Sequence, residues 1–202
     1  VTHRAAITDK KGAARLMIAV EAYDRPVVRA AMQIMAYCFP RPGECRLAQW
    51  DEIDFEERIW TVPASRTKMR REHKIPLSRQ AFAVFERLHK LTAPEGVLCF
   101  PGARIKRPIS ENTICVALRT MGFTMDEMSA HGFRALASTL LHEKSDFSSE
   151  AIERALGHTD ANAIRRAYAR GAHWDERVSM MQWWADYLDG LKDGALEKAA
   201  AG

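Results

Sequence analysis

The residues with the clearest chemical potential lie between positions 131 and 168. His131 and Arg134 stand three residues apart in a proline-free run whose apolar residues recur at helical spacing, so one helix face can carry both. His158 follows a Leu-Gly pair, and Tyr168 comes 10 residues later. A tyrosine hydroxyl, with a pKa of about 10, needs a base and a cationic clamp before it can attack a phosphate. Imidazole and arginine supply these functions, so the set predicts chemistry at a phosphate.

A second arginine and a lysine lie earlier in the chain. Arg41 stands between two prolines, which favour an extended backbone at that position. Lys68 belongs to a basic run, residues 65–74, between two short β-like segments. Considered alone, such a run is either a solvated hairpin tip or a basic finger that enters a nucleic-acid groove.

Taken together and in this order, these segments resemble the tyrosine recombinases, the phage-integrase family, and in particular the integrases of prophages and genomic islands. The resemblance extends from about residue 25 to about residue 189. Any one of its motifs is weak, but six residues in the family's order are specific. By this resemblance the catalytic residues are Arg41, Lys68, His131, Arg134, His158 and Tyr168.

The resemblance implies that Tyr168 attacks a DNA phosphodiester and leaves a 3′-phosphotyrosyl link with a free 5′-hydroxyl. Arg41 and Arg134 would hold the non-bridging oxygens of the phosphate. Lys68 would protonate the departing 5′-oxygen, and His131 would accept the proton of the phenol. The reaction implied in this way needs no metal and no other cofactor.

The resemblance also assigns residues around this set. His158 would hydrogen-bond the phosphate, and Glu44 resembles the family's supporting carboxylate. The chain departs from the family at Phe39-Pro40, where many relatives have Thr-Gly before the arginine. The bases expected to contact the DNA backbone are Arg66, Arg70, Arg71, Lys74, Arg104, Lys106 and Arg107.

Composition agrees with a soluble protein that binds a polyanion. The 202 residues are 47% hydrophobic and 28% charged, with a net charge of +4 that arises before residue 172, because acids outnumber bases after it. No apolar run is long enough to cross a membrane and no signal peptide opens the chain, so a cytoplasmic, nucleoid-associated location is expected. The four cysteines lack metal-ligand spacing and are expected to be reduced and packed.

Periodicity predicts a mostly α-helical protein with a small antiparallel β-sheet, the catalytic-domain fold of tyrosine recombinases. Residues 1–190 are expected to form one catalytic domain that lacks the family's N-terminal DNA-clamping domain, with residues 191–202 as a frayed tail. The strands are expected at residues 52–55, 59–62 and 74–77. Helices are expected in the segment that opens with Thr8 and extends to Val20, and at residues 27–37, 78–91, 112–120, 131–141, 148–156, 162–169 and 174–191.

The predicted function is site-specific DNA recombination, by an integrase that integrates or excises a mobile element such as a prophage. Its expected partners are double-stranded DNA at attachment sites, further copies in a homo-tetramer on DNA although the free chain is a monomer, and accessory DNA-bending proteins, without a membrane. The amphipathic last helix packs either on its own domain or on a neighbouring protomer. Two other functions fit the same residues: a DNA-binding module that no longer cleaves, and a type IB-like topoisomerase.

Overall fold

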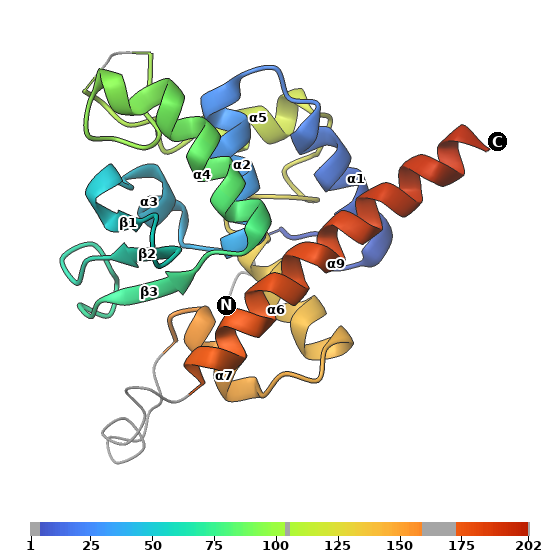
Figure 1. The fold of residues 1–202 in the computed structure, drawn as a ribbon. Coiled ribbons are helices and arrows are strands. Elements are labelled where there is room, and N and C mark those ends of the chain that lie inside the picture. The colour runs from blue at the N-terminus through green and yellow to red at the C-terminus, as the bar shows by residue number, and fades with distance from the viewer. Residues whose placement is uncertain (1–4, 104–105, 159–172, 202) are drawn as a thin grey trace.

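The protein is described here by a computed structural model, which places residues 5–103, 106–158 and 173–201. Helices dominate, and a small antiparallel sheet lies at one side of the domain (Figure 1), which confirms the predicted fold class. The helices are α1 (Lys10–Glu21), α2 (Pro26–Cys38), α3 (Pro42–Arg46), α4 (Arg79–Thr92), α5 (Thr113–Thr120), α6 (Gly132–Lys144), α7 (Ser149–Ala155) and α9 (Trp174–Ala200), with short 3₁₀ turns η1 (Trp50–Glu52) and η2 (Ala93–Glu95).

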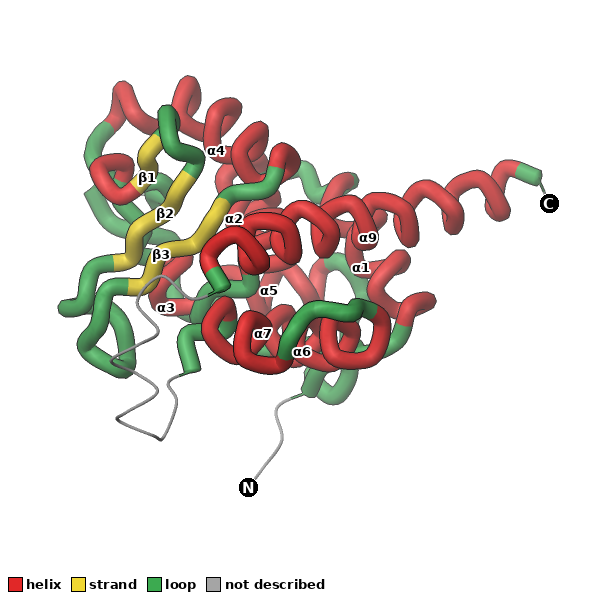
Figure 2. Tube along the Cα trace, turned by 60° about the horizontal axis from the view of Figure 1, so that its bottom comes forward, coloured by secondary structure: helices red, strands yellow, loops and turns green. Residues whose placement is uncertain are grey.

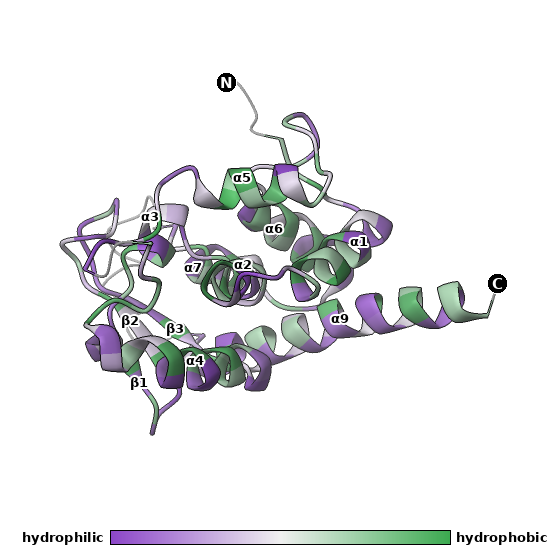
Figure 3. Cartoon of the chain, turned by 90° about the horizontal axis from the view of Figure 1, so that it is seen from above, coloured by the Kyte–Doolittle hydropathy of each residue, from purple (hydrophilic) through white to green (hydrophobic). Residues whose placement is uncertain are grey.

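Helix α2 forms the centre of the domain. Its sequence is apolar on nearly every side, and all but three of its residues are buried. A helix that is hydrophobic all round must be enclosed by other elements. Accordingly, α1, α4, α5 and α6 pack around it, as the view along α2 in Figure 3 shows. The helix ends at Phe39, a buried residue with a left-handed backbone (φ 40°), and so delivers the chain to Arg41.

Several helices begin at a residue whose side chain caps the helix N-terminus. Asp9 accepts a hydrogen bond from the backbone N–H of Gly12 at 2.9 Å, which starts α1. The Ser78 and Ser148 hydroxyls accept in the same way at 3.2 Å and start α4 and α7. Each cap satisfies one of the donors that a helix N-terminus leaves unpaired.

The sheet is a meander of three short antiparallel strands, β1 (Ile53–Asp54), β2 (Ile59–Val62) and β3 (His73–Pro76). Val62 pairs with His73 at the end of the β2–β3 ladder, next to the long connection between these strands. Strand β3 is the edge that contacts α9 (Figure 2). The basic run found in the sequence therefore spans a β-hairpin beside the last helix.

Helix α9 packs on its own domain, against α1, α2, α4 and α7 (Figure 1). Trp184 is completely buried, and its indole Nε1 donates to the carbonyl of Ala36 in α2 at 2.9 Å. The helix continues to Ala200, which differs from the expected frayed tail after residue 190. Its last turns are rich in alanine, the strongest helix former, and Leu191 packs against the core beside α1. No helix in the described ranges combines the length and apolarity needed to span a bilayer.

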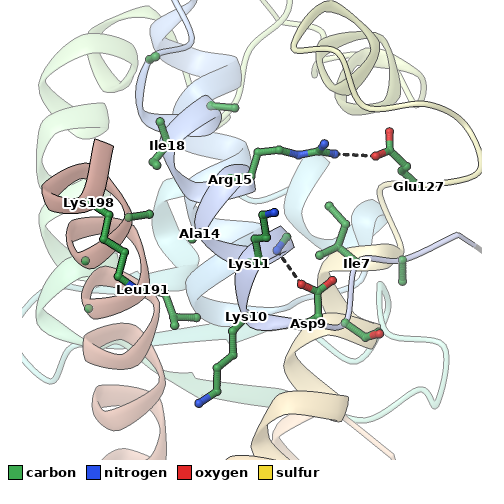
Figure 4. A pocket seen from close by; sticks show the side chains of 18 of the residues that line it. Ile7, Asp9, Lys10, Lys11, Ala14, Arg15, Ile18, Glu127, Leu191 and Lys198 are labelled. Atoms are coloured by element: carbon green, nitrogen blue, oxygen red, sulfur yellow. Dashed lines mark hydrogen bonds and ion pairs between the residues drawn. The ribbon is translucent and has the colours of Figure 1, made fainter. Parts of the chain in front are cut away.

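A pocket of about 1290 Å³ lies between α1 and α9 (Figure 4). Apolar side chains such as Ile18 and Leu191 form much of its wall, while an ion pair of 2.7 Å joins two of its lining residues, Arg15 and Glu127. It lies on the opposite side of the domain from α3 (Figures 1 and 3).

Replacement of Trp184 by Phe tests how strongly α9 is held by the core. The change leaves the Ala36 carbonyl without its donor and creates a small cavity, so we expect a loss of about 2 kcal/mol in unfolding free energy. Trp183→Phe is the matched control, because Trp183 is only partly buried and stacks on Tyr187 at 5.0 Å. Urea unfolding of both variants measures the difference, and equal losses would contradict it.

Candidate active site

Arg41 is fixed by the short turn that begins α3. The prolines on either side predict an extended backbone, and the structure confirms it, with φ −66° and ψ 144°. Glu44 accepts from the Arg41 backbone N–H at 2.9 Å and from its Nη1 at 3.1 Å. Because the Glu44 side chain is only 2% exposed, one buried carboxylate holds both the main chain and the guanidinium of Arg41.

Arg134 lies in the first turn of α6 and joins the ends of two other helices. Its Nη1 donates to the Phe39 carbonyl at 2.7 Å, and its Nη2 donates to the Leu156 carbonyl at 2.6 Å. These residues are the C-caps of α2 and α7. The last carbonyls of a helix lack intrahelical donors and carry partial negative charge, so they stabilise a guanidinium placed between them.

Helix α7 ends in a Schellman motif centred on Gly157. The His158 N–H donates to the Glu153 carbonyl at 2.9 Å, and the Gly157 N–H donates to the Arg154 carbonyl at 3.0 Å. Gly157 has φ +64°, the left-handed conformation that this motif requires and that glycine adopts without steric penalty. The motif turns the chain so that its last carbonyls face the arginines.

The two guanidiniums meet at consecutive carbonyls. Arg41 Nη2 donates to Gly157 at 3.3 Å, while Arg134 donates to Leu156 immediately before it. Burial and the positive charge of Arg41 together lower the pKa of Arg134 to about 10, against the opposing effect of Glu44. Because a pKa of about 10 is still far above 7, the guanidinium of Arg134 stays charged at neutral pH.

His158 is oriented by the helix that precedes it. Its Nδ1 lies 2.6 Å from a Glu153 carboxylate oxygen, and its Nε2 lies 3.5 Å from Arg134 Nη2. A guanidinium only donates, so these partners assign the proton to Nδ1 and the lone pair to Nε2. Half of the side chain is exposed, which leaves the ring open to a ligand beside the arginines.

His131 is the N-cap residue of α6, three residues before Arg134, and so lies just outside the helix that was expected to include it. Together with Pro42 and Gly43 it lines a cavity of about 360 Å³. The described contacts thus join Arg41, Arg134 and His158 into one centre, and His131 lies at the start of the helix that carries Arg134.

Comparison with known proteins identifies the family. The model of the phage integrase family matches residues 7–173. The chain belongs to the phage integrase family. It is 42% identical over 180 residues to the integrase of Enterobacteria phage P4, which covers 82% of this chain and 41% of that protein. It is also 41% identical over 158 residues to the prophage integrase IntA of Escherichia coli K12, with 77% and 37% covered. The chain thus spans less than half the length of these curated relatives.

Solved structures of the family share the fold. The integrase from mycobacterium phage Brujita superposes with a TM-score of 0.67 at 17% identity, over 90% of this chain and 57% of that one. A lambda integrase dimer bound to a COC′ core site gives 0.59 at 19% identity, over 87% and 51%. The resemblance predicted from the sequence is therefore confirmed for the family and for the recombinase catalytic-domain fold.

Two of the residues predicted for phage-integrase chemistry are not joined to this centre. Lys68 is exposed in the β2–β3 connection, where the Thr67 hydroxyl bonds both the N–H and the carbonyl of Arg71. Within the described residues, no hydrogen bond or ion pair links Lys68 to either arginine of the centre. Tyr168 lies outside the described residues, and so does Arg104. The catalytic roles of all these residues stay predictions.

Among the bases expected to contact DNA, Arg66 is directed inwards. It donates to the Leu47 carbonyl and to the Glu52 carboxylate, and only 16% of its side chain is exposed. It therefore holds the base of the hairpin against η1, a structural role that the sequence did not indicate. The remaining described bases of this set are exposed: Arg70, Arg71, Lys74, Lys106 and Arg107.

The structure adds one residue that the sequence analysis missed. His73 begins β3, and a methyl group placed on Gly157 would lie 3.3 Å from its Cε1 and Nδ1 and 3.2 Å from Arg41 Nη1. The imidazole therefore packs over Gly157 beside Arg41. Burial, together with the positive charges of Arg177, Arg134 and Arg41, lowers the pKa of His73 to about 3.

One signal in the sequence could have found His73. Alternate residues of a strand share a face, and Ile75, two residues later, is 2% exposed. The strand period thus places His73 on the buried face, whereas its position in a basic run suggests solvent. The alternation of buried and exposed residues along the strand, and not the basic composition of the run, indicates correctly that His73 faces inwards.

Gly157→Ala should disturb the site through both the backbone and the new methyl group. A left-handed alanine costs about 1–2 kcal/mol, and its Cβ would press on Arg41 and His73. Gly122→Ala is the matched control, because Gly122 also has positive φ (+86°) but nothing within 4 Å of its added Cβ. We expect denaturant unfolding to show a larger loss for Gly157→Ala. Equal losses would mean that the space over Gly157 is not tightly filled.

The low pKa of His73 predicts how stability depends on pH. Between about pH 6.5 and pH 3, the unfolded chain binds a proton at this residue that the folded chain does not, so stability falls as pH falls. From pH 7 to pH 5 this amounts to about 2 kcal/mol. His73→Asn lacks the titration, so its unfolding free energy should decline less over this interval. Parallel pH curves for the two proteins would refute the assignment.

Proposed function

We propose that this chain is the catalytic part of a site-specific DNA recombinase, an integrase that cleaves and rejoins DNA through a 3′-phosphotyrosyl intermediate. One observation carries the proposal: Arg41 and Arg134, 93 positions apart in the sequence, are held on consecutive carbonyls with His158 beside them. Family membership supports it, because the relatives named above are integrases.

The paired guanidiniums suit a phosphate that gains charge during reaction. Each guanidinium has five N–H groups, and the described residues accept from only some of those of Arg41 and Arg134. The remaining donors can bind the non-bridging oxygens, whose charge rises when the phosphorus becomes five-coordinate. Because helix ends and Glu44 fix both groups beforehand, little reorganisation is needed in the transition state.

The proposed step exchanges one phosphoester bond for another. The Tyr168 oxygen bonds to phosphorus and its proton passes to His131. The bond from phosphorus to the 5′-oxygen breaks, and Lys68 gives that oxygen a proton. The bond energy stays in the phosphotyrosyl link, so attack by a 5′-hydroxyl reverses the reaction and joins strands.

Double-stranded DNA is the partner that we infer for this site. The solved neighbours include a lambda integrase dimer bound to a COC′ core site and XerH recombinase bound to a difH substrate, and these support DNA as the ligand. The exposed bases of the hairpin fit phosphate contacts. Assembly into a tetramer and the use of accessory bending proteins stay predictions.

The test is covalent capture of DNA. The protein and its Tyr168→Phe variant are incubated with end-labelled duplexes that carry a nick beside a candidate attachment site, and denaturing gels are run. We expect a shifted covalent band with the unaltered protein and none with the variant, which lacks the nucleophile but keeps its affinity for duplex.

Two outcomes would replace this function by another. Salt-sensitive binding to DNA without any covalent band would favour a non-cleaving DNA-binding module. A covalent band on any nicked duplex, combined with relaxation of supercoiled DNA without strand exchange, would favour a type IB-like topoisomerase. A covalent band retained in Tyr168→Phe would overturn the choice of nucleophile.

A further inference from the structure

His73 presents polar atoms towards the arginine pair. The space over the Cα of Gly157 is bounded by its Cε1–Nδ1 edge and by Arg41 Nη1, at 3.3 Å and 3.2 Å from the position of an added Cβ. The absence of a side chain at Gly157 permits this approach. The imidazole of His73 and the guanidinium of Arg41 therefore border the same small space over Gly157.

The imidazole nitrogens have no adequate hydrogen-bond partner among the described residues. Both are shut off from water, and neither meets the geometry of a hydrogen bond. The backbone of Ala155 has only a small effect, the last of those on the ring, and raises its pKa slightly. Buried polar atoms left unpaired are unfavourable and rare in folded proteins, and those that do occur often serve in catalysis or in ligand binding.

The positive charges around His73 favour an anionic ligand over a cationic one. Arg41, Arg134 and Arg177 all act on the ring with positive charge, and Arg177 also donates to the carbonyl of Lys74, the next residue of β3. The nearby carboxylates are already engaged, Glu44 with Arg41 and Glu153 with His158. These charges keep the ring neutral, so it offers one N–H that persists across the working pH range.

We propose that His73 is a further phosphate-contacting residue of this site, whose neutral imidazole donates a hydrogen bond to a non-bridging oxygen held by Arg41 and Arg134. This inference rests on the proposed strand-cleaving function. In the free protein the ring lies over Gly157, and the phosphate supplies the acceptor that the described residues do not provide. The hydrogen bond moves no proton, unlike the roles proposed for His131 and Lys68.

Three substitutions at His73 separate hydrogen bonding from packing. Phe keeps a planar ring without nitrogens, whereas the side-chain amide of Asn imitates Nδ1 and that of Gln imitates Nε2. We expect His73→Phe to slow covalent complex formation on the order of 10²-fold, the effect typical of removing one such donor. His73→Asn should recover most of the rate, because Nδ1 is the nitrogen that borders the space over Gly157 next to Arg41 Nη1, and His73→Gln should recover less.

Two further measurements exclude a merely structural effect. Duplex affinity, measured by gel shift in a Tyr168→Phe background, should change less than about threefold, because phosphate contacts elsewhere supply most of the binding. The rate deficit of His73→Phe should be the same from pH 6 to pH 9, since the ring is neutral throughout. His89→Phe is the matched control, because His89 is exposed on α4 against Trp50 and lies outside the site.

The outcomes distinguish this inference from the function on which it rests. No covalent complex with the unaltered protein would overturn both. A normal complex together with an unimpaired His73→Phe, or with Asn less active than Phe, would overturn the inference alone and leave His73 as a packing residue. If His73→Phe does not fold, the comparison of Asn with Gln decides, and equal rates for these two variants would also overturn it.

Discussion

The guanidiniums of Arg41 and Arg134 lie side by side in this protein, and most contacts of the described site hold them in place. In water, unit charges 4 Å apart repel by about 1 kcal/mol, and in a partly buried site by about 4 kcal/mol. Arg41 and Arg134 are held against this repulsion by the buried carboxylate of Glu44 and by carbonyls at the ends of α2 and α7. An arriving phosphate relieves the repulsion directly, which makes the free protein receptive to anions.

The ends of α2 and α7 place these carbonyls beside the arginines, and other elements of the fold hold the two helix ends together. Buried helix α2 ends at Phe39 with a left-handed residue, and α7 ends in the Schellman motif at Gly157. Arg134 bonds to both ends, so α6 fixes the distance between them. The β2–β3 hairpin then closes over Gly157 with His73, and Arg177 of α9 ties that strand to the last helix. Local chain endings, more than the sheet, determine the geometry of the centre.

The sequence predicted those parts that depend on local rules. Prolines indicated the extended backbone of Arg41, and apolar periodicity indicated most helices. It also indicated the family, through residue types in order. It could not indicate that Arg66 turns inwards to Glu52 or that His73 is buried among arginines, because both depend on partners distant in the chain. A basic run has the same composition whether its members face solvent, a carboxylate or a phosphate.

Reliance on main-chain acceptors has a consequence for divergence within the family. A carbonyl is present whatever the residue, so the contacts of Arg134 to positions 39 and 156 impose no particular side chain there. Mutations can accumulate around the centre while the turns persist, and solved relatives with 17% and 19% identity still share the fold. Gly157 is the opposite case, because any larger residue there would enter the space beside Arg41 and His73.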